Sequence, residues 1–525
     1  MTNPAAAMRM LITYAVCIPI AILVGYLLTN PLDYGTLGFF GFVTAILISP
    51  LFIKWHYPLL VFSLASPIVC FFIVGRPPLS QVMTFVSLGI AITERILSSH
   101  KRFVSVPVMA APLVFIAGVV FMTAELTGGF GLHSMGGGAG GGRKYIEVFT
   151  GVAVFFALVS QTIPPKRRMF YLMLYMLPGL LTTVSDLFHY LPSPLNAINL
   201  LIPPTVGPTD DISGFSGGVT RLTALGRGLS VGAVYMLARY GMRGIFSALH
   251  PGRMLLFATF FGGSLLGGYR NIFIGIGMTM TLMFFFEGMH RTRLLPAIIM
   301  AGVLGVALLV SFSEKLPLNI QRSMSILPLK WDQEAVQSAE ASSEWRLMMW
   351  RDLWPKVPQY LLLGKGYTIS EQDYNYMGHG AFAGANQSAQ LDTSEQALAI
   401  SSDFHSGPLT TLIPFGIWGA IGMLWLMAAT SFVVYRNYRY GDPELRVFNT
   451  YMLVSNIVGI IGFLFIFGGF NFSVGGFASA AGFSIAMNGG LAKRPARPAV
   501  NLRIKPLPLA VPEETMPVAD RQIPI

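Results

Sequence analysis

The chain has 525 residues, of which 53% are hydrophobic and only 11% are charged, and its mean hydropathy is +0.61. Soluble domains carry about 25% charged residues, so this composition excludes an ordinary water-soluble protein. The net charge of +11 could indicate nucleic-acid binding. Lys and Arg gather in the cytoplasmic loops of membrane proteins, however, and we prefer that topological explanation.

Apolar stretches recur along the whole chain, and at about 20 residues each is long enough to cross the hydrocarbon core as a helix. We therefore predict an all-α fold, a polytopic transmembrane helix bundle of about 12–14 spans with a large, mostly helical periplasmic loop. The N-terminal stretch lacks a small-residue cleavage site, so we expect a retained helix rather than a signal peptide. The predicted spans are 10–28, 36–53, 57–74, 80–97, 105–123, 145–163, 169–189, 222–240, 254–268, 271–287, 294–312, 408–435, 448–468 and 472–489.

The basic residues predict the orientation of these spans. If the N-terminus is cytoplasmic, every inside connection contains Lys or Arg, for example Lys54 and the run at 166–168, while the short outside connections contain few. An even number of spans with both termini in the cytoplasm satisfies the positive-inside rule. The basic, Pro-rich stretch 490–525 is then expected to be a disordered cytoplasmic tail.

Three longer connections fall on the predicted outer side. The segment 124–144 contains the run GGGAGGG at 136–142, which is typical of a flexible linker and lacks the Lys-Ser/Thr signature of a phosphate-binding loop. The segment 190–221 is rich in Pro and Gly. The longest, 313–407, is expected to fold as a cap, because loops of that length are usually functional. The expected organisation is an N-terminal transmembrane bundle over 1–312 with about 11 spans, the periplasmic cap over 313–407, C-terminal transmembrane helices over 408–489, and the tail over 490–525.

Ionisable residues at the outer ends of spans are the candidates for chemistry, because charge near lipid is costly and usually functional. The predicted topology puts Arg221, Arg270 and His405 at one membrane level on the outer side. Two arginines there would bind a multiply charged anion such as a pyrophosphate, because guanidinium groups donate bidentate hydrogen bonds to phosphate oxygens. Each arginine alone could instead extend to lipid headgroups, and His405 could be a structural turn residue. Arg227 lies deeper in its span and needs either a partner or a wet cavity.

The region from about 215 to 435 resembles the O-antigen ligase and polymerase superfamily of bacterial envelope glycosyltransferases. RLTA at 221–224 is similar to the family's R-L-x-G pattern, with Ala in place of Gly. GGYR at 267–270 is similar to its small-residue run that ends in Ser-Arg, with Tyr in place of Ser.

The long outer loop and the span after it extend this resemblance. The family's Arg–Trp segment and glycine turn are matched by Arg346, Trp350, Pro358, Gly364 and Gly366. Its histidine before a span with a Gly-x-x-Gly break is matched by His405 and Ser406, with Gly416 and Gly419 in the span.

The resemblance implies a metal-independent, inverting glycosyltransferase of the bacterial inner membrane. It would transfer an oligo- or polysaccharide from undecaprenyl pyrophosphate to an acceptor hydroxyl on the periplasmic face. Arg270 and Arg221 would stabilise the leaving pyrophosphate, and His405 would be the general base, because imidazole titrates near neutral pH. The residues expected to contact substrate are Arg346, Arg227, Asp403 and Tyr269.

Neither a cofactor nor a metal is expected, although 210–211 and the Asp403–His405 pair are the nearest candidates for metal ligands. The expected partners are the undecaprenyl-pyrophosphate-linked glycan donor, a glycan, lipid A-core or protein acceptor, and membrane lipids, without nucleic acid. The sequence does not distinguish a ligase from a polymerase, because the two share the chemistry that determines the motifs. The alternative function is that of a multi-span transporter or a lipid-linked glycan flippase. Two halves of the chain with a matching pattern and broken helices would indicate such a protein.

Overall fold

The computed structural model describes residues 4–27, 29, 34–73, 75–98, 103–130, 141–187, 198–203, 221–292, 295–368, 402 and 404–493. Over these residues the chain is built from helices without a β-strand, apart from one isolated bridge between Val69 and Pro78. The predicted all-α polytopic class is confirmed.

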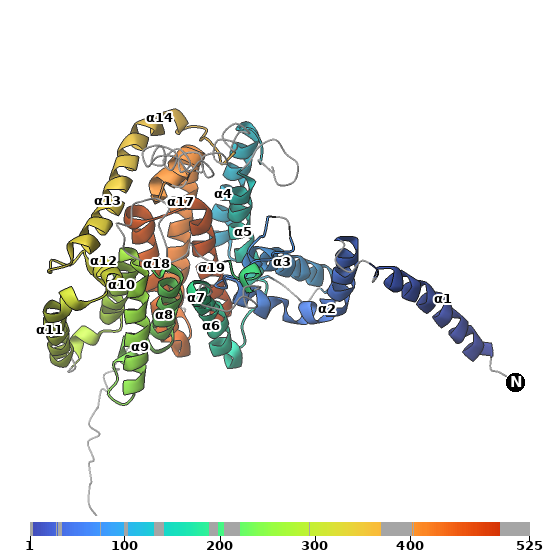
Figure 1. Ribbon diagram of the computed structural model, residues 1–525, viewed down its shortest axis with the longest axis horizontal. Coiled ribbons are helices and arrows are strands. Elements are labelled where there is room, and N and C mark those ends of the chain that lie inside the picture. The colour runs from blue at the N-terminus through green and yellow to red at the C-terminus, as the bar shows by residue number, and fades with distance from the viewer. Residues whose placement is uncertain are drawn as a thin grey trace, which may run out of the picture.

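Figure 1 labels the helices in chain order. The N-terminal set is α1 (Pro4–Leu27), α2 (Tyr34–Ser63), α3 (Leu79–Leu97), α4 (Pro107–Leu126), α5 (Gly142–Leu158), α6 (Arg168–Met176), the 3₁₀ helix η3 (Leu177–Thr183) and α7 (Val184–Leu187). The middle set is α8 (Thr223–Ile245), α9 (Pro251–Ser264), η6 (Leu265–Gly267), α10 (Arg270–Phe286) and α11 (Leu295–Phe312). The last sets are α12 (Leu318–Met324), α13 (Gln333–Leu353) and α14 (Val357–Tyr360), followed by α17 (Gly407–Tyr440), α18 (Arg446–Ile461), the π-helical segment η11 (Gly462–Ile466) and α19 (Phe470–Asn488).

Several of these helices are long and apolar enough to cross a membrane. Within the described residues, five stretches meet that criterion: Pro107–Leu126, Pro165–Leu187, Gly407–Tyr440, Pro443–Ile466 and Phe470–Asn488. Shorter apolar helices, among them Arg270–Phe286, accompany them. The positions of α4 to α11 and α17 to α19 follow the predicted spans closely.

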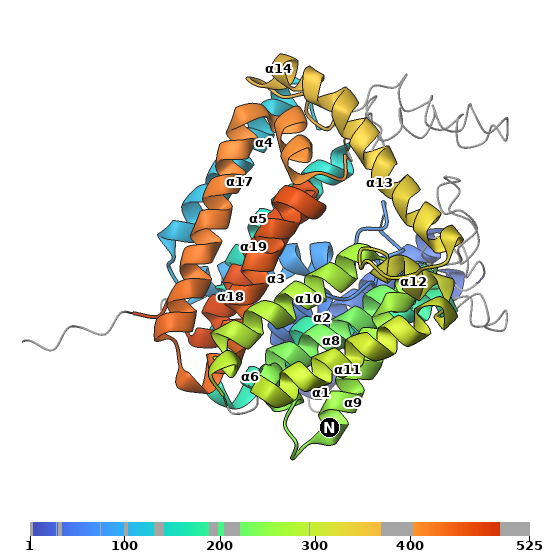
Figure 2. The same ribbon diagram turned by 90° about the vertical axis from the view of Figure 1, so that its left-hand side faces the viewer.

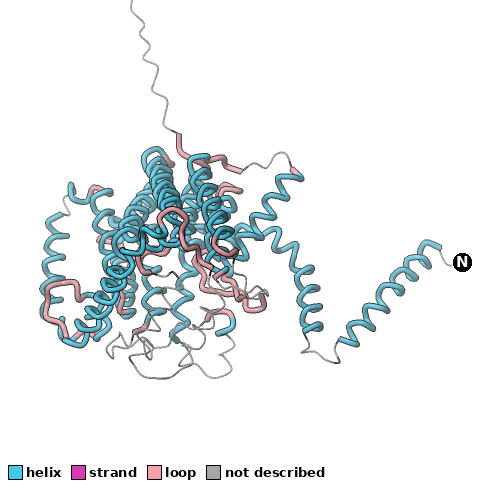
Figure 3. The backbone as a smooth tube through the Cα atoms, turned by 90° about the horizontal axis from the view of Figure 1, so that it is seen from above, coloured by secondary structure: helices cyan, strands magenta, loops and turns pink. Residues whose placement is uncertain are grey.

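The N-terminal part differs from the expectation. Spans 36–53 and 57–74 are not separate helices, because α2 is continuous from Tyr34 to Ser63 and Lys54, expected in a loop, lies within it. The helix ends before residue 74 because Pro67 disfavours a helical conformation in the residue before it. Figure 3 shows α1 extending away from the rest of the helices on one side.

Small residues bring the central helices together. A Cβ added at Gly151 of α5 would lie 2.7 Å from the backbone nitrogen of Gly475 in α19, so these two helices touch backbone to backbone. Helices α12, α13 and α14 lie across one end of the bundle, which we call the cap face. Figure 2 shows α13 running obliquely from α12, beside α10, to α14, above α17.

Helix α13 is the longest of the three cap helices. Asp332 caps its N-terminus by accepting a hydrogen bond from the backbone of Glu334 at 2.9 Å. Its inner stripe consists of the small buried residues Ala335, Ser338 and Ala339, whose spacing places them on one helical face. This stripe allows α13 to pack closely on α12 and to form the described part of the cap.

Candidate functional site

The turn between α9 and α10 carries the first candidate arginine. Gly268 adopts a left-handed conformation with φ of +67°, which lets the chain leave η6 and enter α10 at Arg270. The first turn of α8 packs directly on this turn, because a Cβ at Gly226 would lie only 2.6 Å from Gly267 Cα. The glycines therefore bring the start of α8, with its two arginines, to the start of α10.

The ring of Tyr269 contacts two arginines at the start of α8. The guanidinium carbon of Arg221 is 4.7 Å from the centre of the Tyr269 ring, and that of Arg227 is 5.0 Å from it. Arg227 also donates a hydrogen bond of 2.9 Å to the Tyr269 hydroxyl. Arg227 thus has the partner that its depth in the helix required, and the ring holds both cations through cation–π contacts.

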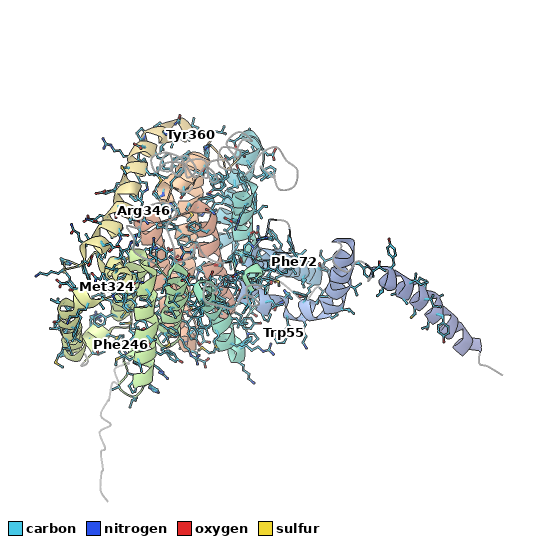
Figure 4. All side chains as sticks on the ribbon, in the orientation of Figure 1. Trp55, Phe72, Phe246, Met324, Arg346 and Tyr360 are labelled. Atoms are coloured by element: carbon cyan, nitrogen blue, oxygen red, sulfur yellow. The ribbon has the colours of Figure 1, made fainter. Side chains whose placement is uncertain are left out.

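Arg346 of α13 brings a third element to the same place. Burial lowers the pKa of Arg346, and the positive charges of Arg270 and Arg221 lower it further. Its Nε is buried and has no hydrogen-bond partner among the described residues. Arg270 donates a hydrogen bond of 2.7 Å to the hydroxyl of Ser343, on the same helix as Arg346. Figure 4 labels Arg346 on α13 and Met324 at the end of α12.

Three arginines from the starts of α8 and α10 and from α13 therefore converge beneath the cap. Arg270 also experiences the negative charge of Glu340 on α13, so the site holds three cations beside one carboxylate. Bringing like charges together in a partly buried position costs free energy, and such an excess of positive charge is typical of a site for an anion. We call Arg221, Arg270 and Arg346 the arginine cluster.

Helix α12 fixes the turn that carries Arg270. Its side chains donate to three successive parts of that turn: Asn319 to the carbonyl of Leu266 at 3.0 Å, Ser323 to that of Leu265 at 2.8 Å, and Arg322 to that of Gly268. Arg322 is 4% exposed and also donates to the Ser338 hydroxyl of α13 at 2.8 Å. The cap thus satisfies the carbonyl groups at the end of α9 and holds the arginine-bearing turn in place.

A buried carboxylate supports the start of α8 from below. Asp186 of α7 is 4% exposed, and its Oδ2 accepts a hydrogen bond of 2.8 Å from the backbone of Leu225 in the first turn of α8. A carboxylate at this position stabilises the helix N-terminus and so fixes the turn that presents Arg221 and Arg227. Sequence reasoning missed Asp186 and Arg322, because neither belongs to a motif and each depends on a contact between distant segments.

His405 lies on the connection into α17. It has a left-handed backbone with φ of +50°, which is rare for a residue with a side chain. Its ring is nearly perpendicular to that of Phe467, with 5.1 Å between the ring centres. Trp350, one helical turn after Arg346, donates a hydrogen bond of 3.1 Å to the carbonyl of Phe404. This bond ties the segment that carries His405 to the helix that carries Arg346.

A broken helix sets the direction of this segment. Within α17, Gly416 has φ of +58° and ψ of −155°, and the turn after α14 fills the break. Ile417 donates to the carbonyl of Leu361 at 2.7 Å, and Gly366 donates to that of Pro414 at 2.9 Å. Gly364 and Gly366 both adopt positive φ, +79° and +74°, which this close approach requires.

The remaining candidate residues are not part of the arginine cluster. Asp403, 210–211 and the stretch 131–140 that contains most of the glycine run lie outside the described residues. Within the described residues, no group of three or more His, Cys, Asp or Glu side chains is placed to hold a metal ion. Tyr367, which follows the glycine turn at 364–366, is 3% exposed and packs in the core against Tyr145 and Phe415.

Comparison with known proteins bears on the segment that contains most of this geometry. Residues 255–424 match the family model of O-antigen ligase, from α9 into α17, so Arg270, Arg346 and His405 fall inside the match and Arg221 precedes it. Comparisons with curated proteins and with solved structures found no match. This match confirms the resemblance to the O-antigen ligase and polymerase superfamily over residues 255–424.

Proposed function

We propose that this O-antigen ligase domain transfers an oligo- or polysaccharide from undecaprenyl pyrophosphate to an acceptor hydroxyl beneath the cap. The observation that carries the proposal is the arginine cluster, in which three cations from separate elements lie together in a partly buried position. A lipid pyrophosphate is a multiply charged anion at the membrane surface, and its charge is opposite to that of this cluster.

The cluster would act on the leaving group. The acceptor oxygen attacks the anomeric carbon from the face opposite the pyrophosphate, the anomeric carbon–oxygen bond breaks, and the electron pair passes to the pyrophosphate, with inversion. Arg270, Arg221 and Arg346 would stabilise the negative charge that develops there, which is usually the largest catalytic contribution. Guanidinium groups would supply the charge neutralisation that a metal ion supplies in other phosphate enzymes, so we propose a metal-independent reaction.

The acceptor would lose its proton to His405. Its segment is tied to α13 through Trp350, and its backbone is held in a rare conformation, as is common at functional sites. We propose that Asp403 orients His405. Tyr269 and Arg227 would contact the donor at the edge of its site.

The orientation of the molecule follows from the same proposal. We place the cap face in the periplasm and both termini in the cytoplasm of the bacterial inner membrane, because the predicted inside connections are the basic ones. The energy for transfer then comes from the donor linkage itself, without a nucleotide.

Single replacements in the native host test the proposal. Arg221→Ala, Arg270→Ala and His405→Ala should each abolish the surface polysaccharide or its attachment on gels, at normal protein abundance. Arg351→Ala is the matched control, because Arg351 is an exposed arginine on the same α13 helix as Arg346. Build-up of carrier-linked long chains would indicate a ligase, and build-up of single repeat units a polymerase. Wild-type polysaccharide in all three variants would contradict the transferase proposal.

A further inference from the structure

The far end of α8 carries a second group of arginines. Helix α8 has 23 residues and is therefore about 34 Å long, close to the ~30 Å thickness of a hydrocarbon core. Because its start lies beneath the cap, its end lies near the opposite membrane surface. Figure 1 shows the connection from α8 to α9 at the end of the bundle opposite to α14.

A tyrosine ring holds two of these arginines together. The guanidinium carbon of Arg253, in the first turn of α9, is 4.4 Å from the centre of the Tyr240 ring. That of Arg239 is 5.1 Å from the same centre, and Arg239 also donates a hydrogen bond to the Tyr235 hydroxyl. Cation–π contacts keep two cations close without neutralising either of them. The ring of Tyr269 contacts two arginines in the same way at the start of α8.

A break in α8 adds a third arginine. Gly241 has φ of +65° and ψ of 177°, which interrupts the helix. Beyond it, the backbone amides of Met242 and Arg243 donate to the two carboxylate oxygens of Glu287 at 3.0 and 2.9 Å. Glu287 directly follows α10, so it ties the end of α10 to that of α8. The Arg243 side chain lies over this connection, because a Cβ added at Gly288 would be 3.8 Å from its Nη2.

The three arginines gather around the end of α8. Arg253 reaches this end from α9, because a Cβ added at Gly244, the neighbour of Arg243, would be 3.9 Å from its Nη1. Among the described residues, none of the three forms an ion pair with a carboxylate, and Glu287 is engaged by backbone amides. Arg243 is exposed and the other two are half-buried, so an anion can reach this excess of positive charge. We call Arg239, Arg243 and Arg253 the distal arginines.

Exposed apolar side chains continue from the distal arginines along α9. Met254, Leu255 and Leu256 directly follow Arg253, and all three are exposed, Leu255 at 70%. Apolar side chains on the surface of a membrane helix face lipid chains, and basic groups at the helix end lie at the level of the headgroups. A ligand with both a phosphate and hydrocarbon chains matches this sequence of surfaces, whereas a soluble phosphate would use only the arginines.

We propose that the distal arginines bind the phosphate headgroup of an anionic phospholipid in the membrane leaflet opposite to the cap, with its acyl chains along the exposed face of α9. This site is independent of the proposed donor site, because the two lie at opposite ends of α8. A lipid bound there would hold the ends of α8 and α10 and the start of α9 together at the membrane surface.

Lipid titration of the purified full-length protein in detergent tests this site. Phosphatidylglycerol should raise the thermal unfolding temperature in a concentration-dependent way, because it binds the folded protein, and phosphatidylcholine with the same acyl chains should raise it far less. Arg239→Gln/Arg253→Gln should increase the half-saturating concentration of phosphatidylglycerol roughly 25-fold, because each cation near a membrane surface contributes about fivefold. Arg253→Gln alone should increase it about fivefold and serves if the double variant fails to fold.

Arg351→Gln/Lys356→Gln is the matched control, because it removes two exposed cations from the cap and changes the net charge equally. It should respond to phosphatidylglycerol as the wild type does, and so should Arg270→Ala. An unchanged response in the variants of the distal arginines, or an equal response of the wild type to phosphatidylcholine, would overturn the proposal. Loss of the response in Arg270→Ala would place the lipid at the arginine cluster instead. An equal response to glycerol 3-phosphate would identify a soluble phosphate as the ligand and overturn the lipid.

Discussion

Single side chains at the site are held in positions that cost stability. Arg346 is the clearest case, because it is partly buried, its Nε has no partner among the described residues, and two further arginines act on it. Residue types and motif order predicted Arg221, Arg270 and Arg346 as candidates for one site. The two cation–π contacts of Tyr269 could not be predicted, because they depend on the close contact between Gly226 and Gly267.

We predict that Arg346→Met stabilises the protein and abolishes most of its activity. Removing one charge relieves the repulsion from Arg270 and Arg221, which should stabilise the fold by roughly 0.5–2 kcal/mol. Loss of the cation should lower glycan transfer about 10²–10³-fold. Thermal unfolding in detergent and a transfer assay on the same preparation measure the two effects, with Arg351→Met as control. A destabilised Arg346→Met protein would show that Arg346 is a structural residue.

At the scale of elements, the cap and the bundle are joined by hydrogen bonds at the places where helices break or end. The turn after α14 satisfies the break at Gly416, and α12 satisfies the end of α9. The sequence indicated the first break through Gly364, Gly366 and Gly416. It could not indicate the second, because Asn319, Arg322 and Ser323 look like any polar helix surface.

Gly416→Ala should destabilise the junction between cap and bundle. The φ of +58° and ψ of −155° strain any residue with a side chain by about 1–3 kcal/mol, and the added Cβ would clash with the carbonyl of Leu361. The expected result is a clearly lower unfolding temperature and reduced transfer. Gly302→Ala in α11, where a Cβ meets no atom within 4 Å, is the control and should be neutral or stabilising. Equal stability of the two variants would contradict this interpretation of the break.

Arg322→Met should loosen the cap from the arginine-bearing turn. It removes donors to the Gly268 carbonyl and to Ser338, and hydrogen bonds from charged donors contribute about 1.5–3 kcal/mol each. Limited proteolysis should then cleave α12 and α13 faster than in wild type, whereas Lys330→Met, at an exposed position of the cap, should not change the rate. Unchanged protection in Arg322→Met would refute its role as a clamp.

For the whole molecule, composition and span length predicted the all-α membrane class and the place of most helices. The predicted division of the N-terminal part into two spans was wrong, because α2 is one helix across Lys54. Pro50 and Pro58 lie inside α2 without ending it. Hydropathy alone does not tell a helix of 30 residues from two spans with a short connection.

Cysteine labelling tests the proposed orientation. In a variant with Cys17 and Cys70 replaced by Ala, a membrane-impermeant maleimide should label Lys356→Cys on the cap in intact spheroplasts. Arg439→Cys, at the far end of α17, should react only after lysis, because the basic ends of spans lie inside. The reverse pattern would place the cap in the cytoplasm and rule out a periplasmic site.

The central claim is that the arginine cluster holds a lipid pyrophosphate while a glycan leaves it. Its most direct test is turnover by the purified protein in vesicles with undecaprenyl-pyrophosphate-linked glycan and acceptor extracted from the native host. The account predicts glycan transfer and stoichiometric release of undecaprenyl pyrophosphate by the wild type and by Arg351→Ala, and neither by Arg270→Ala. Full release by Arg270→Ala, or transfer without release of undecaprenyl pyrophosphate, would contradict it.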